Sequence, residues 1–165
     1  MDRLHGASIR GDGLTLRPWT PSDVNVLIEI FDDDDVSFRT PLPSPFTRLD
    51  AETYLRTRDG YCDYLILSED GAPVGQIMLN TSSHMVSYMV ARHARGQGYA
   101  SRALALLYGQ VREWGVRSVG LEIEPDNLAS VRVAQRCAFR RTGEAPEEVR
   151  DKGRTYRLET WRLSV

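Results

Sequence analysis

At 165 residues, the chain has the length of one compact domain. Hydrophobic residues make up 41% and charged residues 27%, which excludes the composition of a disordered chain, and no apolar run is long enough to cross a membrane. The 21 basic and 23 acidic residues give a net charge of -2, without the positive excess that nucleic-acid-binding proteins use. We therefore expect neither nucleic acid nor a membrane as a partner.

The ends and the cysteines add little further chemistry. Residues 1–6 are not followed by an apolar stretch, which argues against a secretory signal and favours the cytoplasm. Cys62 and Cys137 are too few for a disulfide framework and lack the spacing of a zinc site. We expect reduced thiols, no metal and a single domain over residues 1–165.

The first half of the chain predicts a strand, two helices and three further strands. Alternation predicts strands, Pro21 is typical of a helix start, and the prolines at 41, 43 and 45 forbid a regular helix there. In order, we expect a strand at residues 14–17, helices at 21–31 and 49–56, a hairpin of strands 64–67 and 74–79 with its turn at 69–71, and a strand at 85–90.

The second half contains the clearest helix. Apolar residues recur at helical spacing from Ala100 to Trp114. A strand at residues 119–123 follows, Asp126 and Asn127 cap another helix to about residue 137, and strands at 139–142 and 156–163 flank a charged loop at 144–154. This order favours an α+β domain with a mixed sheet.

A glycine-containing loop leads from the strand at 85–90 into the long helix. Gly96 and Gly98 allow positive φ and let a phosphate approach the backbone, where the N–H groups of a helix N-terminus are unpaired. Arg95 adds a permanent positive charge. The alternative is an ordinary glycine-rich turn. A P-loop is disfavoured because no Gly-Lys-Ser/Thr follows, and a dinucleotide fingerprint because Ser101 replaces its third glycine.

Arg95-x-x-Gly98-x-Ala100 resembles the motif with which the GNAT superfamily of N-acetyltransferases binds the pyrophosphate of acetyl-CoA. The resemblance covers about residues 14–163 and implies an α+β fold with a mixed central sheet of about six to seven strands, about four flanking helices and splayed central parallel strands. The donor-binding residues that it implies are Met89, Val90, Arg95, Gly96, Gln97, Gly98, Tyr99, Ala100, Ser101 and Asn127.

A second motif is similar to the RimJ/RimL-type branch of that superfamily. It consists of Asn127-x-x-Ser130 followed by Ala138-Phe139, where Ala138 replaces the usual glycine. The resemblance implies that the Ser130 hydroxyl protonates the leaving thiolate of CoA and that Asn127 lies near the pantetheine arm. The alternative for Ser130 is an ordinary first-turn serine that stabilises the helix.

The general base is less clearly marked. Many relatives carry a glutamate near the start of the strand before the phosphate loop, where this chain has His84. His84 is a candidate because histidine titrates near neutral pH, although a polar surface residue is the alternative. Glu122 and Glu124 could act through water, but their alternation with Leu121 and Ile123 fits a solvated face equally well.

Four consecutive aspartates occupy residues 32–35, in the region that builds the acceptor side of the cleft in this superfamily. They are either a solvated loop or an acidic rim that attracts a cationic amine, with Glu144, Glu147 and Glu148 adding to the field. We expect transfer of an acetyl group from acetyl-CoA to a polyamine, an aminoglycoside or a protein N-terminus.

The resemblance implies direct attack of a primary amine in a ternary complex, without an acyl-enzyme, by a monomer or homodimer. The alternative is a GNAT-like domain that binds acetyl-CoA as a sensor or interaction module without efficient catalysis. A third function, nucleotide-dependent phosphoryl transfer, is disfavoured by the absent Lys-Ser/Thr pair.

Overall fold

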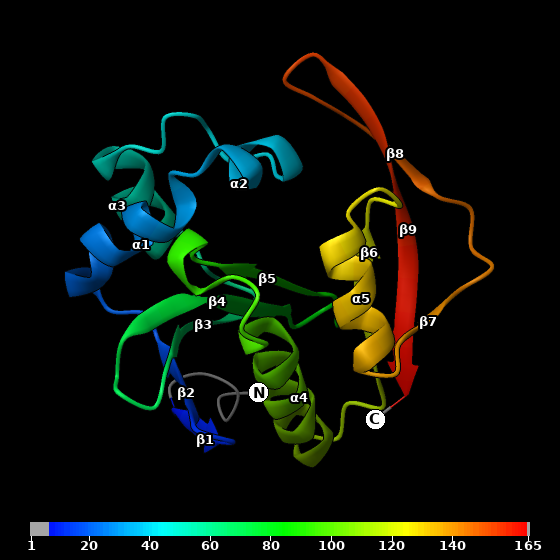
Figure 1. Cartoon of the computed structure of the whole chain (residues 1–165), viewed down its shortest axis with the longest axis horizontal. Coiled ribbons are helices and arrows are strands. Elements are labelled where there is room, and N and C mark those ends of the chain that lie inside the picture. The colour runs from blue at the N-terminus through cyan, green and yellow to red at the C-terminus, as the bar shows by residue number, and fades with distance from the viewer. Residues whose placement is uncertain (1–6, 165) are drawn as a thin grey trace.

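Two sheets and the helices around them make up the computed structural model, which describes residues 7–164 and confirms the predicted α+β class (Figure 1). Residues 1–6, where no secretory signal was expected, lie outside the described residues. The strands are β1 (Ile9–Gly11), β2 (Leu14–Pro18), β3 (Tyr61–Leu67), β4 (Pro73–Asn80), β5 (Val86–Val90), β6 (Ser118–Ile123), β7 (Arg140–Arg141), β8 (Glu147–Asp151) and β9 (Arg154–Ser164). The helices are α1 (Val24–Phe31), α2 (Asp34–Arg39), α3 (Arg48–Arg56), α4 (Tyr99–Glu113) and α5 (Leu128–Arg136), with 3-10 turns η1 (Pro21–Asp23) and η2 (Arg92–Ala94).

The first sheet has the order β1-β2-β3-β4-β5, and every neighbouring pair is antiparallel. Its central strands are buried on both faces, as shown by the consecutive buried residues Tyr64, Leu65 and Ile66 of β3. Helices α1 and α3 lie on one face and α4 on the other (Figure 1). This explains why β3 and β4 are apolar runs rather than strict alternations.

The second sheet is built around the long strand β9. Strand β6 pairs with it antiparallel, so that Leu121 lies opposite Trp161, and β7 and β8 also pair with β9. Helix α5 packs against β6 and beside α4. Between residues 7 and 164, no helix has the length and apolarity needed to cross a membrane.

The two sheets meet at one parallel bridge between Met85 and Gly120, where the Gly120 N–H donates to the His84 carbonyl at 3.0 Å. Beyond this bridge β5 and β6 belong to separate sheets and diverge, which confirms the predicted splay (Figure 1). A Cβ on Gly120 would lie 2.5 Å from the Met85 sulfur, so a larger residue here would displace the Met85 side chain.

Helix α2 occupies residues for which no helix was predicted, and the irregular segment predicted at residues 41–45 follows it. Asp33 is its N-cap and accepts hydrogen bonds from the N–H groups of Asp35 and Val36. The interpretation of residues 32–35 as a solvated loop was therefore wrong, because a four-aspartate run contains both a cap and the acidic first turn that a helix dipole favours.

The charged segment at 144–154 was expected to be a loop, but it contains strand β8 and the two-residue turn Lys152-Gly153, both with positive φ. Strand β1 was also missed, and it joins β2 through a similar turn at Asp12-Gly13. Both hairpins have the turn type that matches strand twist. Strand β8 escaped prediction because most of its residues are exposed, so its sequence lacks apolar alternation.

The tip of the β8–β9 hairpin is fastened to α2, far away in sequence (Figure 1). The Lys152 ammonium donates to the carbonyls of Ser37 at 2.6 Å and Thr40 at 2.8 Å. Below it, the Glu124 carboxylate pairs with both Arg39 of α2 and Arg154 of β9. The open ends of the two sheets are thereby bridged across the top of the molecule.

Candidate active site

A cavity of about 510 Å³ lies where β5 and β6 diverge. Its walls come from α2, from the end of β5, from the loop into α4 and from α5. Nine of the ten predicted donor-binding residues line it, together with Ser130: Met89, Val90, Arg95, Gly96, Gly98, Tyr99, Ala100, Ser101 and Asn127. The two sequence motifs, which are separated by about a fifth of the chain, therefore contribute to one cavity.

The loop between β5 and α4 has the backbone that the two glycines predict. Gly96 and Gly98 have φ of 76° and 79°, and Gly98 is the N-cap of α4. A Cβ would meet nothing within 4 Å at either position, so glycine is needed for backbone conformation rather than for space. The N–H groups of the first turn of α4 are left facing the cavity without helical acceptors.

Ser101 in this first turn has a buried hydroxyl for which the described residues supply no hydrogen-bond partner. Leaving a hydroxyl unsatisfied costs about 1–3 kcal/mol, so such a group in a cavity wall is suited to a ligand oxygen. Ser101 and the backbone N–H groups thus present several donors to one anion.

Arg95 does not extend freely into the cavity as the motif suggested. Its Nε donates to the Val90 carbonyl at 3.1 Å, and its terminal nitrogens pair with Asp33 at 3.1 Å and Asp35 at 3.0 Å. Arg92 pairs with the same Asp33 carboxylate at 3.1 Å. Burial raises the pKa of Asp33, but these arginines outweigh it and hold that pKa below its usual value. Arg95 therefore braces the phosphate loop against α2.

The free positive charge at the cavity comes instead from α5, which sequence reasoning did not identify. Arg132 and Arg136 stand one turn apart on this helix, and both line the cavity. Neither forms an ion pair with any residue in the part of the chain that the structure describes. The helical spacing of two arginines beside the Asn127 motif was the signal that could have found them.

Tyr88 and Ser130 also line the cavity and contribute two hydroxyl groups. Asn127 caps α5 by accepting from the Ser130 N–H at 3.3 Å, which leaves the Ser130 hydroxyl unused by the cap. Burial raises the pKa of Tyr88 to about 12, and the Ser130 hydroxyl opposes this increase.

Two predicted residues do not line the cavity. Gln97 turns back to donate to the His93 carbonyl at 3.3 Å. His84 lies in the turn between β4 and β5, with φ of 57°, at the joined end of the two strands rather than beside the phosphate loop. The His84 carbonyl accepts the hydrogen bond from Gly120, so the backbone of His84 helps to join the two sheets.

Glu122 and Glu124 have different environments although they alternate on the same strand. The Glu124 carboxylate is buried between two arginines, which gives it a structural partner on each side. Glu122 points away from the buried Leu121 and Ile123. Burial and the nearby Glu147 carboxylate raise its pKa, against the opposing effect of an arginine on β9.

The aspartates at 32–35 are mostly occupied within the protein. Asp32 accepts from the Phe46 N–H at 2.9 Å, and Asp33 and Asp35 are bound to arginines. The predicted acidic rim is therefore not a run of free carboxylates. Of the carboxylates predicted to form this rim, Asp34 and Glu147 are exposed and have no hydrogen-bond or ion-pair partner among the described residues.

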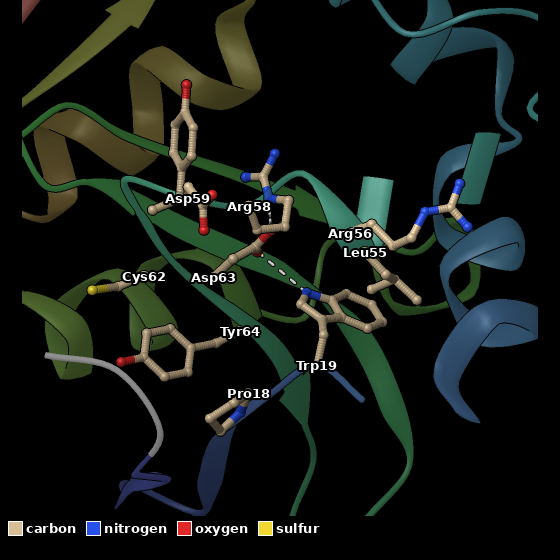
Figure 2. Close-up of a pocket in the computed structure, with 10 residues that line it drawn as sticks. Pro18, Trp19, Leu55, Arg56, Arg58, Asp59, Cys62, Asp63 and Tyr64 are labelled. Atoms are coloured by element: carbon tan, nitrogen blue, oxygen red, sulfur yellow. Dashed lines mark hydrogen bonds and ion pairs between the residues drawn. The ribbon is translucent and has the colours of Figure 1, made fainter. Parts of the chain in front are cut away.

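A second cavity of about 280 Å³ shares no lining residue with the first. Its buried Asp63 accepts from Trp19 at 3.2 Å and pairs with Arg58 at 2.9 Å (Figure 2). It also accepts from Tyr54 at 2.9 Å and Gln76 at 2.7 Å. Burial raises the pKa of Asp63, whereas these four partners favour its charged form. The Asp63 carboxylate is therefore fully occupied by contacts that fix β3 to the neighbouring elements, and we assign this cavity a structural part.

Comparison with known proteins agrees with this geometry. The model of the acetyltransferase (GNAT) domain matches residues 13–140, which is most of the chain. RimL, a ribosomal L7/L12 alpha-N-protein acetyltransferase, has a similar fold with a TM-score of 0.84 at 18% identity, covering 96% of this chain and 94% of that chain.

Two further solved structures share the fold. A GNAT acetyltransferase from Bacillus anthracis gives a TM-score of 0.83 at 19% identity, with 96% and 98% of the two chains covered. Spermidine N-acetyltransferase from Vibrio cholerae, in complex with CoA and spermine, gives 0.79 at 14% identity, with 93% and 96% covered. With its family match, its splayed strands and its glycine loop, the chain belongs to the GNAT family of acetyltransferases.

Proposed function

We propose that this protein transfers the acetyl group of acetyl-CoA to a cationic primary amine by direct attack in a ternary complex. The observation that carries the proposal is the cavity itself, which joins a donor-rich helix N-terminus, two free arginines and a serine hydroxyl. Acetyl-CoA needs these groups because its nucleotide part has a pyrophosphate and a 3′-phosphate, and its pantetheine arm ends in the thioester that reacts.

The residues present fit this donor. The orphaned hydroxyl of Ser101 and the backbone N–H groups after Gly98 would bind the pyrophosphate. Arg132 and Arg136 would compensate the remaining phosphate charge. The diverging edge of β5 at Met89 and Val90 would bind the pantetheine amides, because its backbone groups have no strand partner on that side.

Ser130 would return a proton to the sulfur. It lines the cavity, and its hydroxyl is not used by the helix cap. As the amine nitrogen attacks the acetyl carbon, the C–S bond breaks and its electron pair goes to sulfur. Counted from the cationic amine, the nitrogen loses two protons, one before attack and one after it, and the sulfur gains one, so one proton is released to solvent and no covalent enzyme intermediate forms.

The acceptor must lose a proton because an alkyl amine is protonated at neutral pH, with a pKa of about 10. Glu122 is exposed and does not line the cavity, so it would act as the base through water; it has no ion-pair partner among the described residues, and desolvation and the Glu147 carboxylate raise its pKa. Glu122 and Glu147 would also attract a cationic amine. Glu124 is less suited because two arginines hold its carboxylate.

The test is release of free CoA thiol from acetyl-CoA with a panel of polyamines, aminoglycosides and N-terminal peptides. Amine-dependent release by the wild type, reduced at least about 100-fold by Glu122→Gln at neutral pH, is expected. Glu148→Gln, on the neighbouring hairpin, is the matched control and should retain activity. Tight CoA binding without release for any amine would favour a CoA-binding sensor instead.

A further inference from the structure

Tyr88 has a buried hydroxyl that the described part of the chain leaves without a geometrically formed hydrogen bond. A buried, unpaired hydroxyl destabilises a fold, and native structures contain few of them. Tyr88 is also not an isolated core residue, because it lines the cavity beside the phosphate loop. A phenylalanine would pack the same ring without this cost, so the hydroxyl calls for another explanation.

The partner available to it is Ser130. Tyr88 comes from β5 and Ser130 from the first turn of α5, so the two hydroxyls face the cavity from elements on either side of it. Hydrogen bonding with Ser130 opposes the increase in the pKa of Tyr88 that burial causes, so the two hydroxyls are neighbours. The cap of α5 uses the Ser130 N–H and not its hydroxyl.

We propose that Tyr88 is a positioning residue for acetyl transfer, which donates its phenolic hydrogen to Ser130 Oγ and thereby directs the hydrogen of Ser130 toward the leaving sulfur. This inference rests on the proposed function and names a residue that the sequence motifs do not contain.

The hydrogen bond strengthens as the reaction proceeds. When the C–S bond breaks, Ser130 gives its proton to sulfur and negative charge develops on Ser130 Oγ, where the phenol stabilises it. Tyr88 keeps its own proton, which fits a phenol whose pKa burial has raised to about 12. Ser130 regains a proton from the amine nitrogen through solvent and so returns to its starting state, while the first proton of the cationic amine is released to solvent.

The test compares Tyr88→Phe with Tyr108→Phe, which removes a phenol hydroxyl from α4 outside the cavity. We expect Tyr88→Phe to lower kcat about tenfold, the effect of one hydrogen bond in the transition state, with little change in KM for acetyl-CoA. Its melting temperature should stay within about 4 °C of the wild type, since one neutral hydrogen bond contributes about 1 kcal/mol of net stability. Tyr108→Phe should leave kcat unchanged.

Pairing each tyrosine change with Ser130→Ala separates positioning from packing. If Tyr88 acts through Ser130, Tyr88→Phe should have no further effect in the Ser130→Ala background. An unchanged kcat in the single variant, or an equal tenfold loss in both backgrounds, would overturn the role of Tyr88 while leaving the proposed function intact. If the wild-type protein released no CoA thiol with any amine, the proposed function and the role of Tyr88 would both be refuted.

Discussion

Replacing Glu124 with glutamine should destabilise the protein through the clamp between α2 and the β8–β9 hairpin. The carboxylate is buried, and it pairs with Arg39 and Arg154. Removing one partner of a fully buried pair costs about 3–5 kcal/mol. The arginine side chains here are 29% and 25% exposed, and each keeps another acceptor, Asp126 or the Phe38 carbonyl.

We therefore expect a smaller loss of about 2 kcal/mol, which lowers the melting temperature of a chain of this size by about 4–8 °C. Thermal unfolding followed by circular dichroism measures it. Glu122→Gln, two residues earlier on the same strand, is the matched control and should shift the melting temperature by no more than about 2 °C. Equal melting temperatures for the two variants would refute the clamp.

Four further predictions follow from particular residues. Gly98→Val, forced into φ of 79°, should abolish CoA binding in calorimetry while circular dichroism still shows a folded protein. Arg132→Ala with Arg136→Ala should weaken CoA binding about tenfold or more and reduce its salt dependence, whereas retained affinity would exclude these arginines as phosphate ligands. Ala138→Gly should raise the melting temperature by about 2–4 °C, because Ala138 has φ of 64°, and a decrease would contradict this. The hydrogen bond from an arginine lowers the pKa of Asp23, so its stabilisation is present above the unfolded value of about 3.9 and is lost as pH falls through the lower folded value; Asp23→Asn should cost stability at pH 7, and the gap from wild type should close in acid.

The phosphate loop could be predicted because its signal is local. Gly96 and Gly98 follow a strand and precede a periodic helix, and the structure gives both the positive φ that this position requires. Ser130 and Asn127 were likewise found from a short motif, and the structure brings them to the same cavity. Features of this kind can be predicted because residues close together in the sequence determine them.

The contacts of the charged residues could not be predicted, because their partners lie far away in sequence. Asp33 binds Arg95, which follows it by about sixty residues, and Glu124 lies between arginines of α2 and β9. From the sequence alone, such charges resemble a solvated surface. The buried hydroxyl of Tyr88 also has no sequence signature, because its hydrogen-bonding state depends on the side chains that the fold packs around it.

The most direct measurement is mass spectrometry of amine acceptors after incubation with isotope-labelled acetyl-CoA. The account predicts one labelled acetyl group on the nitrogen of a cationic primary amine, formed by the wild type and not by Gly98→Val. CoA bound tightly in the cavity, with no labelled acetyl group on any amine of the panel, would contradict it.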